Sequence, residues 1–152
     1  MGNRGAIKAL LRLAEKRENG KVREIVLAAP DVDSMLFDKD FAKPLCQSYP
    51  RVTVYASDKD RALWSSDALS HVARVGEIRN GNPTILARAN LNIIDASNVE
   101  TSFLNHSYFG DATSVISDIF QLVRNKDAAP NVRSNTIQKK NGANGEFWYF
   151  RK

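Results

Sequence analysis

The 152-residue chain has little cysteine and no long apolar run, and both absences limit what it can be. The single cysteine, Cys46, excludes an internal disulfide bond and leaves too few thiolates for a cysteine-based zinc site. No segment approaches the roughly 18 to 20 consecutive apolar residues of a membrane-spanning helix, and the first residues lack the apolar stretch of a secretory signal. We expect no membrane segment, a packed Cys46, and a soluble, cytoplasmic protein if the chain is complete as given.

Motifs for nucleic acids, nucleotides and metals are also missing. The formal net charge is +5, but basic and acidic residues are mixed, and a local basic excess is confined to the C-terminal "RSNTIQKKNGANGEFWYFRK". No RNA-recognition, zinc-finger or helix-turn-helix signature accompanies this excess, and neither glycine-rich nucleotide motif is present. The pair Asp31 and Asp33 has no further metal ligands beside it. We expect no nucleic-acid partner, no cofactor and no metal.

What is present is an alternation of helix and strand patterns. The first residues, "MGNRGAIKALLRLAEKREN", carry apolar residues at helical spacing. The nearly continuous apolar run in "VREIVLAAP" then predicts a strand buried on both faces. Two more strands are expected in "RVTVYAS" and "LNIIDAS", and helices are expected over 61–75 and 111–126. The alternation predicts an α/β fold with about three parallel strands and flanking helices.

The remaining segments set the expected organisation of the chain. Residues 76–89, rich in glycine, asparagine and proline, are expected to form a loop. The pieces "NTIQ" and "EFWYF" around "KKNGANG" are compatible with a C-terminal hairpin. We therefore expect an α/β unit over residues 1–125, followed by a basic tail that contains aromatic residues over 126–152.

Polar residues follow each predicted strand, where parallel sheets gather their ligands and catalytic groups. Asp31 follows the first strand, and Asp58 and Asp60 follow the second. His106 lies in the segment after the third strand, and Asp95 is expected to cap the turn that leaves it. A carboxylate that orients an imidazole, and an imidazole that moves a proton, form an acid–base pair. A single aspartate at a strand end is more often a helix cap or a loop hydrogen-bonder.

The first residues resemble the segment that follows the serine in an α/β-hydrolase nucleophile elbow of the form His-Ser-Met-Gly-Asn. Further pieces agree with this in order and spacing: "VLAAPDVD", "VTVYASDKDRAL", "IDAS" and "NHSYFGD". Together they resemble an uncharacterised branch of the α/β-hydrolases, a domain of unknown function, from Met1 to about Arg124. The resemblance implies that the three strands are the last three of a hydrolase sheet, and that this chain is its C-terminal portion.

The resemblance also implies the roles of individual residues. His106 matches the triad histidine, and Asp60 matches the triad acid, with Asp58 and Asp31 as alternatives. The full-length parent would then hydrolyse a small-molecule ester or a related acyl bond through Ser/Asp/His chemistry.

The same resemblance places the nucleophile outside this chain. Met1 would follow the serine directly and, with Gly2, would lie on the oxyanion side. No serine of this chain lies in an elbow, so we expect no triad hydrolysis from it alone. The strand that should pair with "REIVLAAP" would also be missing, which leaves an exposed sheet edge. The alternative to a hydrolase portion is therefore a non-catalytic interaction module that associates through this edge.

Overall fold

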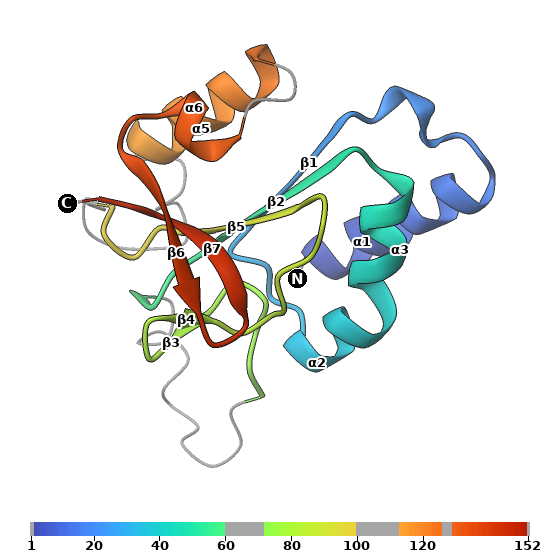
Figure 1. Cartoon of the computed structure of the whole chain (residues 1–152). Coiled ribbons are helices and arrows are strands. Elements are labelled where there is room, and N and C mark those ends of the chain that lie inside the picture. The colour runs from blue at the N-terminus through green and yellow to red at the C-terminus, as the bar shows by residue number, and fades with distance from the viewer. Residues whose placement is uncertain (1, 60–71, 100–112, 126–128, 152) are drawn as a thin grey trace.

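The computed structural model describes residues 2–59, 72–99, 113–125 and 129–151. A five-stranded sheet with the order β1-β2-β5-β7-β6 forms the centre of the described part, and helices flank it (Figure 1). Strands β1 (Glu24–Ala28), β2 (Arg51–Ala56) and β5 (Leu91–Asp95) pair in parallel. The three expected parallel strands are therefore confirmed, and they are neighbours in the sheet.

The expected C-terminal hairpin is also confirmed. Strands β6 (Ile137–Gly142) and β7 (Gly145–Phe150) are antiparallel, and β7 pairs in parallel with β5. The turn is shorter than expected, because "KKNG" belongs to β6 and only residues 143–144 lie between the two strands. Gly145, the first residue of β7, has a φ of +104°. Glycine adopts such a φ without the strain that a Cβ would add. The hairpin thus extends the same sheet as the hydrolase-like strands.

Helices precede and separate the strands, and those expected in the first residues and over 111–126 are confirmed as α1 and α5. Before β1 come α1 (Gly2–Glu15) and a 3-10 turn, η1 (Asn19–Lys21). Between β1 and β2 come α2 (Ser34–Leu36), a π-helical turn, η2 (Phe37–Phe41), and α3 (Ala42–Ser48). Between β5 and β6 come α5 (Thr113–Arg124) and α6 (Pro130–Arg133). Most of the helix expected over 61–75 lies outside the described residues. Its last part, residues 72–75, is not helical, because these residues instead pair with the segment that follows β1.

Two apolar clusters occupy the two faces of the sheet. One contains Ile7 of α1, Leu45 of α3 and Val54 of β2, and the other contains Val115 of α5 and Tyr55 of β2. Neighbouring residues of one strand enter opposite clusters because side chains alternate along a strand. All six residues of β2 are buried, as befits a strand with a neighbour on each side.

Strand β1 differs from the expectation of burial on both faces. Its Ile25 and Leu27 are buried, whereas Glu24, Val26 and Ala28 are only half-buried. The reason is that β1 lies at the end of the sheet, so the cluster beneath α5 covers its second face only in part.

The segment expected to be a loop contains a small antiparallel ribbon. Strands β3 (Ile78–Arg79) and β4 (Asn82–Pro83) pair across Asn80 and Gly81, which have φ angles of +50° and +72°. Asn-Gly is the preferred sequence for such a tight turn. The ribbon contacts the tip of the β6–β7 hairpin, where the backbone N–H of Ala143 donates to Asn82 Oδ1 at 2.8 Å.

Candidate functional site

The carboxyl ends of β1, β2 and β5 lie at one edge of the sheet, because these strands are parallel neighbours. This is the edge at which open α/β sheets place their ligands and catalytic groups. The segments that leave it carry Asp31 after β1 and Asp58 after β2, and Asp95 is the last residue of β5. We take this edge as the candidate site.

After β1, both aspartates have structural partners. Asp31 Oδ1 lies 3.4 Å from Arg74 Nη1, and Asp33 caps α2 by accepting the N–H of Leu36 at 2.9 Å. The cation beside Asp31 therefore comes from residues 73–76, the segment that pairs with the chain after β1.

The turn that leaves β1 is strained and tightly enclosed. Ala29 has a φ of +40°, which is unusual for a residue with a Cβ. Gly76 contacts this turn so closely that a Cβ there would lie 2.6 Å from the carbonyl carbon of Ala29. Such backbone strain concentrates at functional sites and persists only where surrounding contacts enforce it. Here the enforcing contact is the hydrogen bond from Gly76 N–H to Pro30 O, at 3.0 Å.

After β2, the side chain of Asp58 is exposed while its backbone is held. The N–H of Asp58 donates to Ser97 Oγ at 2.9 Å, which joins the end of β2 to the end of β5. Lys59 makes a second connection, because its Nζ donates to the backbone oxygen of Val99 at 2.6 Å. Ser57 is fully buried and its hydroxyl accepts the N–H of Lys59, so it is a structural residue and not an elbow nucleophile.

At the end of β5, the expected turn cap is confirmed. Asp95 Oδ1 accepts the backbone N–H of Ser97 at 2.8 Å. Burial raises the pKa of Asp95, and the negative charge of Asp58 raises it further, while Ser97 and Lys140 oppose the shift. The sequence prediction missed this proximity of two carboxylates. The signal was present in "SDKD" and "IDAS", which follow two strands that the sheet places side by side.

The described residues therefore contain only part of the predicted site. The charge of Asp58 raises the pKa of Asp95, which burial raises most, whereas Asp31 lies beside Arg74. Gly2 is exposed at the start of α1, and the space beside its Cα is open. Three further predicted site residues lie outside the described residues: Met1, Asp60 and His106.

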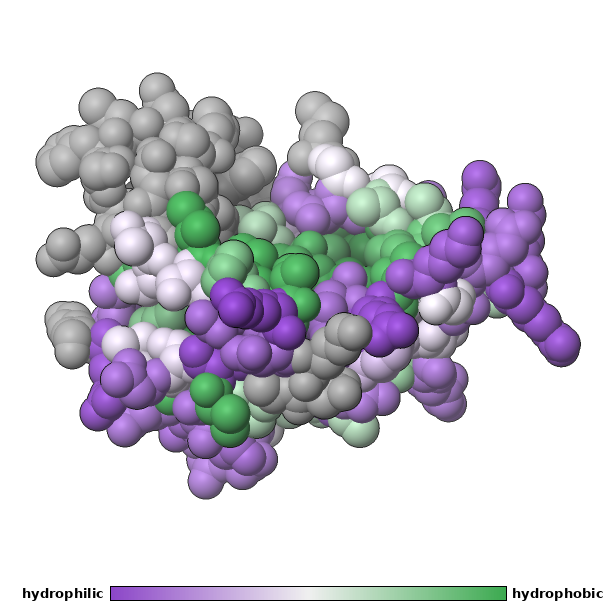
Figure 2. Space-filling model, turned by 90° about the horizontal axis from the view of Figure 1, so that it is seen from above, coloured by the Kyte–Doolittle hydropathy of each residue, from purple (hydrophilic) through white to green (hydrophobic). Residues whose placement is uncertain are grey.

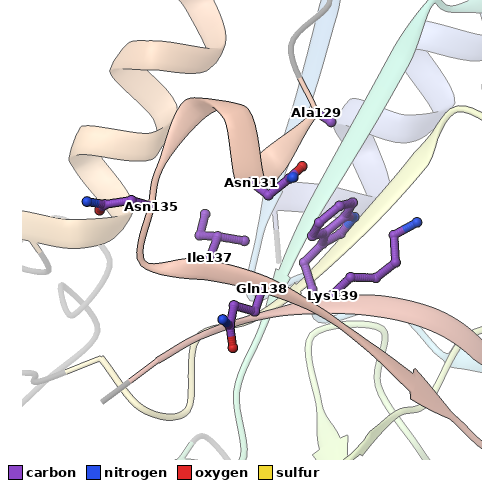
Figure 3. A pocket seen from close by; sticks show the side chains of 7 residues that line it. Ala129, Asn131, Asn135, Ile137, Gln138 and Lys139 are labelled. Atoms are coloured by element: carbon purple, nitrogen blue, oxygen red, sulfur yellow. The ribbon is translucent and has the colours of Figure 1, made fainter.

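A hollow of about 710 Å³ lies elsewhere, against α6 and the hairpin (Figure 3). Its polar side chains do not converge, since Asn135 and Gln138 point away from Asn131 in Figure 3. Gln138 Oε1 also accepts the hydroxyl of Tyr149 at 2.9 Å. Lys139 is likewise engaged, because its Nζ is 3.1 Å from Glu146 Oε2. The hollow thus lacks the convergent polar groups of a ligand site.

Aspartate and glutamate side chains, together with Cys46, are the candidate metal ligands in residues 2–59, 72–99, 113–125 and 129–151. In these ranges no three histidine, cysteine, aspartate or glutamate side chains lie close enough together to hold a metal ion. None of the helices in the described part of the chain is long and apolar enough to cross a membrane.

Comparison with known proteins gives one positive result. No curated protein and no solved structure matches the chain. Residues 1–126 match the family described as "Alpha/beta hydrolase of unknown function (DUF900)", which covers the three parallel strands and α1 to α5. Because this match spans most of the sequence and agrees with the sheet described above, the chain belongs to this family of α/β-hydrolases.

Proposed function

We propose that this chain supplies the acid and the histidine of a serine hydrolase, and that the residues preceding it supply the serine. The observation that carries the proposal is the position of α1. This helix begins at Gly2, and the hydrolase family match begins at residue 1. In a nucleophile elbow the serine lies on the turn between a strand and a helix, directly before such a helix.

In this proposal His106 removes the proton from the serine hydroxyl, and an aspartate after β2 orients the imidazole. Asp60 is the favoured acid, with Asp58 and Asp31 as alternatives. Of these two alternatives the geometry favours Asp58, because its carboxylate is exposed at the strand end while Asp31 is engaged by Arg74. The substrate class is a small ester or a related acyl compound. The chain alone is expected to be inactive.

The test compares this chain with a longer chain that adds the polypeptide encoded directly upstream. Each protein is exposed to a fluorophosphonate, which labels activated serines, and assayed with p-nitrophenyl esters. We expect labelling and hydrolysis only in the longer chain. His106→Ala and Asp60→Ala should each lower kcat/KM by about 10³-fold or more.

His71→Ala is the matched control for the histidine, since the chain has two histidines in all. Its activity should stay within a few-fold of the unsubstituted protein. An equal loss from His71→Ala and His106→Ala would contradict the assignment of the histidine. An inactive longer chain that folds normally would contradict the hydrolase proposal.

The open side of β1 favours a second candidate, an interaction module that binds a strand of another polypeptide. Within the described residues β1 pairs with β2 alone. The N–H of Ala29 donates to Tyr55 O, and N–H directions alternate along a strand, so the N–H groups of Val26 and Ala28 point to the open edge. An apolar strand with free N–H groups is a template for strand addition.

Exposed hydrophobic side chains on another surface accord with association. The large ones on α5 and α6 are Ile116, Phe120, Val123 and Val132. Viewed from above, the molecule shows a band of hydrophobic side chains with hydrophilic ones on both sides (Figure 2). Association predicts a sedimentation coefficient that rises with concentration, and Ala28→Pro should abolish this rise by removing one outward N–H. A monomer at all concentrations would contradict this second candidate.

A further inference from the structure

The tight turn between β3 and β4 places an asparagine directly before a glycine whose backbone nitrogen is accessible. Asn80 and Gly81 are both exposed, and they lie between the paired residues Arg79 and Asn82. Among the described residues, the side chain of Asn80 has no hydrogen-bond partner, and neither has the N–H of Gly81. We propose that Asn80 is a site of spontaneous deamidation, in which the nitrogen of Gly81 displaces the side-chain amide. This modification is independent of the proposed hydrolysis.

The reaction consumes water and needs no other reactant. The Gly81 amide loses its proton to water, and its nitrogen then attacks Cγ of Asn80. A bond forms between this nitrogen and Cγ, the Cγ–Nδ2 bond breaks, and Nδ2 takes up a proton and leaves as ammonia. Water then opens the resulting cyclic succinimide at either of its carbonyl groups. The products are an aspartyl or an isoaspartyl residue at position 80.

The turn leaves room for this attack. Gly81 has no Cβ to shield its nitrogen, and the nearest atom to an added Cβ would be Lys140 Nζ, at 4.0 Å. The ribbon is also short, since β3 and β4 pair through two residue pairs. A two-stranded ribbon of this size is marginally stable by itself, so its turn opens at a low free-energy cost. Asn80 therefore has the rotational freedom that ring closure requires.

Two groups beside the turn favour the reactive, deprotonated form of the Gly81 amide. The negative charge of a deprotonated amide is shared between its nitrogen and the oxygen of the same peptide group. That oxygen, Asn80 O, already accepts a hydrogen bond from Asn82 Nδ2 at 3.0 Å. The ammonium of Lys140 lies beside Gly81 and stabilises the same negative charge electrostatically. Both contacts therefore promote the attack.

The chain contains three further Asn-Gly pairs, and the structure restrains each of them. Asn19 and Asn144 each donate from Nδ2 to a backbone oxygen, at 2.7 and 2.8 Å. Asn141 precedes Gly142 inside β6, and both residues pair with β7. These three must break hydrogen-bonded structure before they can react. The sequence ranks the four pairs equally, whereas the structure favours Asn80.

The isoaspartyl product changes the shape of the turn as well as its charge. It inserts a methylene group into the main chain, and a two-residue turn cannot absorb this insertion while the Arg79–Asn82 pair remains. Asn82 Oδ1 accepts the N–H of Ala143, at the tip of the C-terminal hairpin, at 2.8 Å. The modification should therefore loosen the ribbon from the hairpin.

The first test compares the four asparagines within one molecule. The protein is incubated at mildly alkaline pH, and peptide mapping by mass spectrometry follows the exchange of NH2 for OH at each position. In urea we expect similar rates at all four, because each precedes a glycine. In native buffer Asn80 should react at least about 10-fold faster than Asn19, Asn141 and Asn144, which must first open. A rate at Asn80 no higher than at the other three would overturn the proposal.

The second test measures the contribution of Lys140. Lys140→Gln should slow the native reaction at Asn80 by about 2- to 5-fold, because a nearby positive charge is lost, and should leave the rate in urea unchanged. Lys139→Gln is the matched control, since Lys139 lies on the opposite face of β6 and is 3.1 Å from Glu146. Equal native rates in the two variants would overturn the contribution assigned to Lys140.

The third test measures the loosening of the ribbon. The isoaspartyl form is separated by ion exchange, and the exchange of the Ala143 amide proton with water is followed by NMR. We expect this exchange to be about 5- to 10-fold faster in the isoaspartyl form, as the loss of one hydrogen bond predicts. Asn80→Gln, incubated in the same way, should keep the slow rate. An unchanged rate in the isoaspartyl form would overturn the predicted effect on the hairpin.

Discussion

Arg133 and Asp118 form a bidentate ion pair in which both side chains are fully buried. Nε donates to Oδ1 at 2.9 Å, Nη2 donates to Oδ2 at 2.9 Å, and the hydroxyl of Tyr55 reaches the same Oδ2 at 2.5 Å. Asp118 and Tyr55 lie within the family match at residues 1–126, whereas Arg133 lies beyond it. The C-terminal segment therefore compensates a charge in the interior of the hydrolase-like part.

Removing the arginine should leave Asp118 buried and unpaired. We expect Arg133→Met to lower the free energy of unfolding by about 3 to 5 kcal/mol, the cost of breaking a buried ion pair. Urea denaturation followed by circular dichroism measures this change. The double variant Asp118→Leu with Arg133→Met is the control, since it removes both charges and should be more stable than Arg133→Met alone. A single variant as stable as the unsubstituted protein would show that the pair contributes nothing.

The close contact at Gly76 predicts a specific intolerance. A Cβ at this position would lie 2.6 Å from the carbonyl carbon of Ala29, in backbone that cannot easily move. We expect Gly76→Ala to lower the free energy of unfolding by about 1 to 3 kcal/mol, as overpacking does. Gly20→Ala is the control, because a Cβ there has nothing within 4 Å. Equal Tm values for the two variants would contradict the described turn.

Asp95 should make stability depend on pH. Its pKa is raised in the folded protein, mainly by burial, so the folded state binds this proton more tightly than the unfolded state does. The stability contributed by this group is therefore present at low pH and is lost as pH rises from the ordinary aspartate value to the raised one. Asp95→Asn should remove that loss.

The measurement is urea denaturation of Asp95→Asn and the unsubstituted protein at several pH values. The variant should gain stability relative to the unsubstituted protein as pH rises through this window, and the difference should stay constant above it. Asp58→Asn is the control for the charge repulsion. It should narrow the pH range over which stability is lost, because the pKa of Asp95 is then raised less. A difference that shrinks with rising pH would contradict the raised pKa.

Cys46 should react slowly with thiol reagents. It is buried, and burial raises the pKa of its thiol, although Arg88 opposes the shift. Because the thiolate is the reactive form, the raised pKa slows the reaction, and the burial of the sulfur slows it further by limiting access of the reagent. With 5,5′-dithiobis(2-nitrobenzoate) at neutral pH, we expect rapid labelling only after addition of denaturant. Rapid labelling of the folded protein would place Cys46 at the surface.

The strands were predictable because their signal is local. "EIVLA", "RVTVYA" and "LNIID" are rich in β-branched and apolar residues, and each forms a strand at that position. The β3–β4 ribbon was missed because Pro83 and Gly81 are typical of loops, although Asn80 and Gly81 also form a tight turn. The parallel pairing of β7 with β5 depends on tertiary packing, which periodicity does not record.

The candidate site was predictable only in part. Strand ends located Asp31, Asp58 and Asp95, but which carboxylates meet depends on which strands are neighbours. The hydrogen bond from the N–H of Asp58 to Ser97 Oγ could not be predicted, because it joins two segments that lie 39 residues apart in the sequence. The ion pair of Asp118 with Arg133 could not be predicted either. Asp118 lies in an otherwise apolar helical stripe, and the sequence around it does not indicate which cation it pairs with.

The most direct measurement of the central claim is fluorophosphonate labelling and ester hydrolysis by the chain extended with its upstream polypeptide. The account predicts activity in the extended protein, its loss in His106→Ala, and its retention in His71→Ala. A folded extended protein that neither binds the fluorophosphonate nor hydrolyses any p-nitrophenyl ester would contradict the assignment of this chain to the acid–base part of a serine hydrolase.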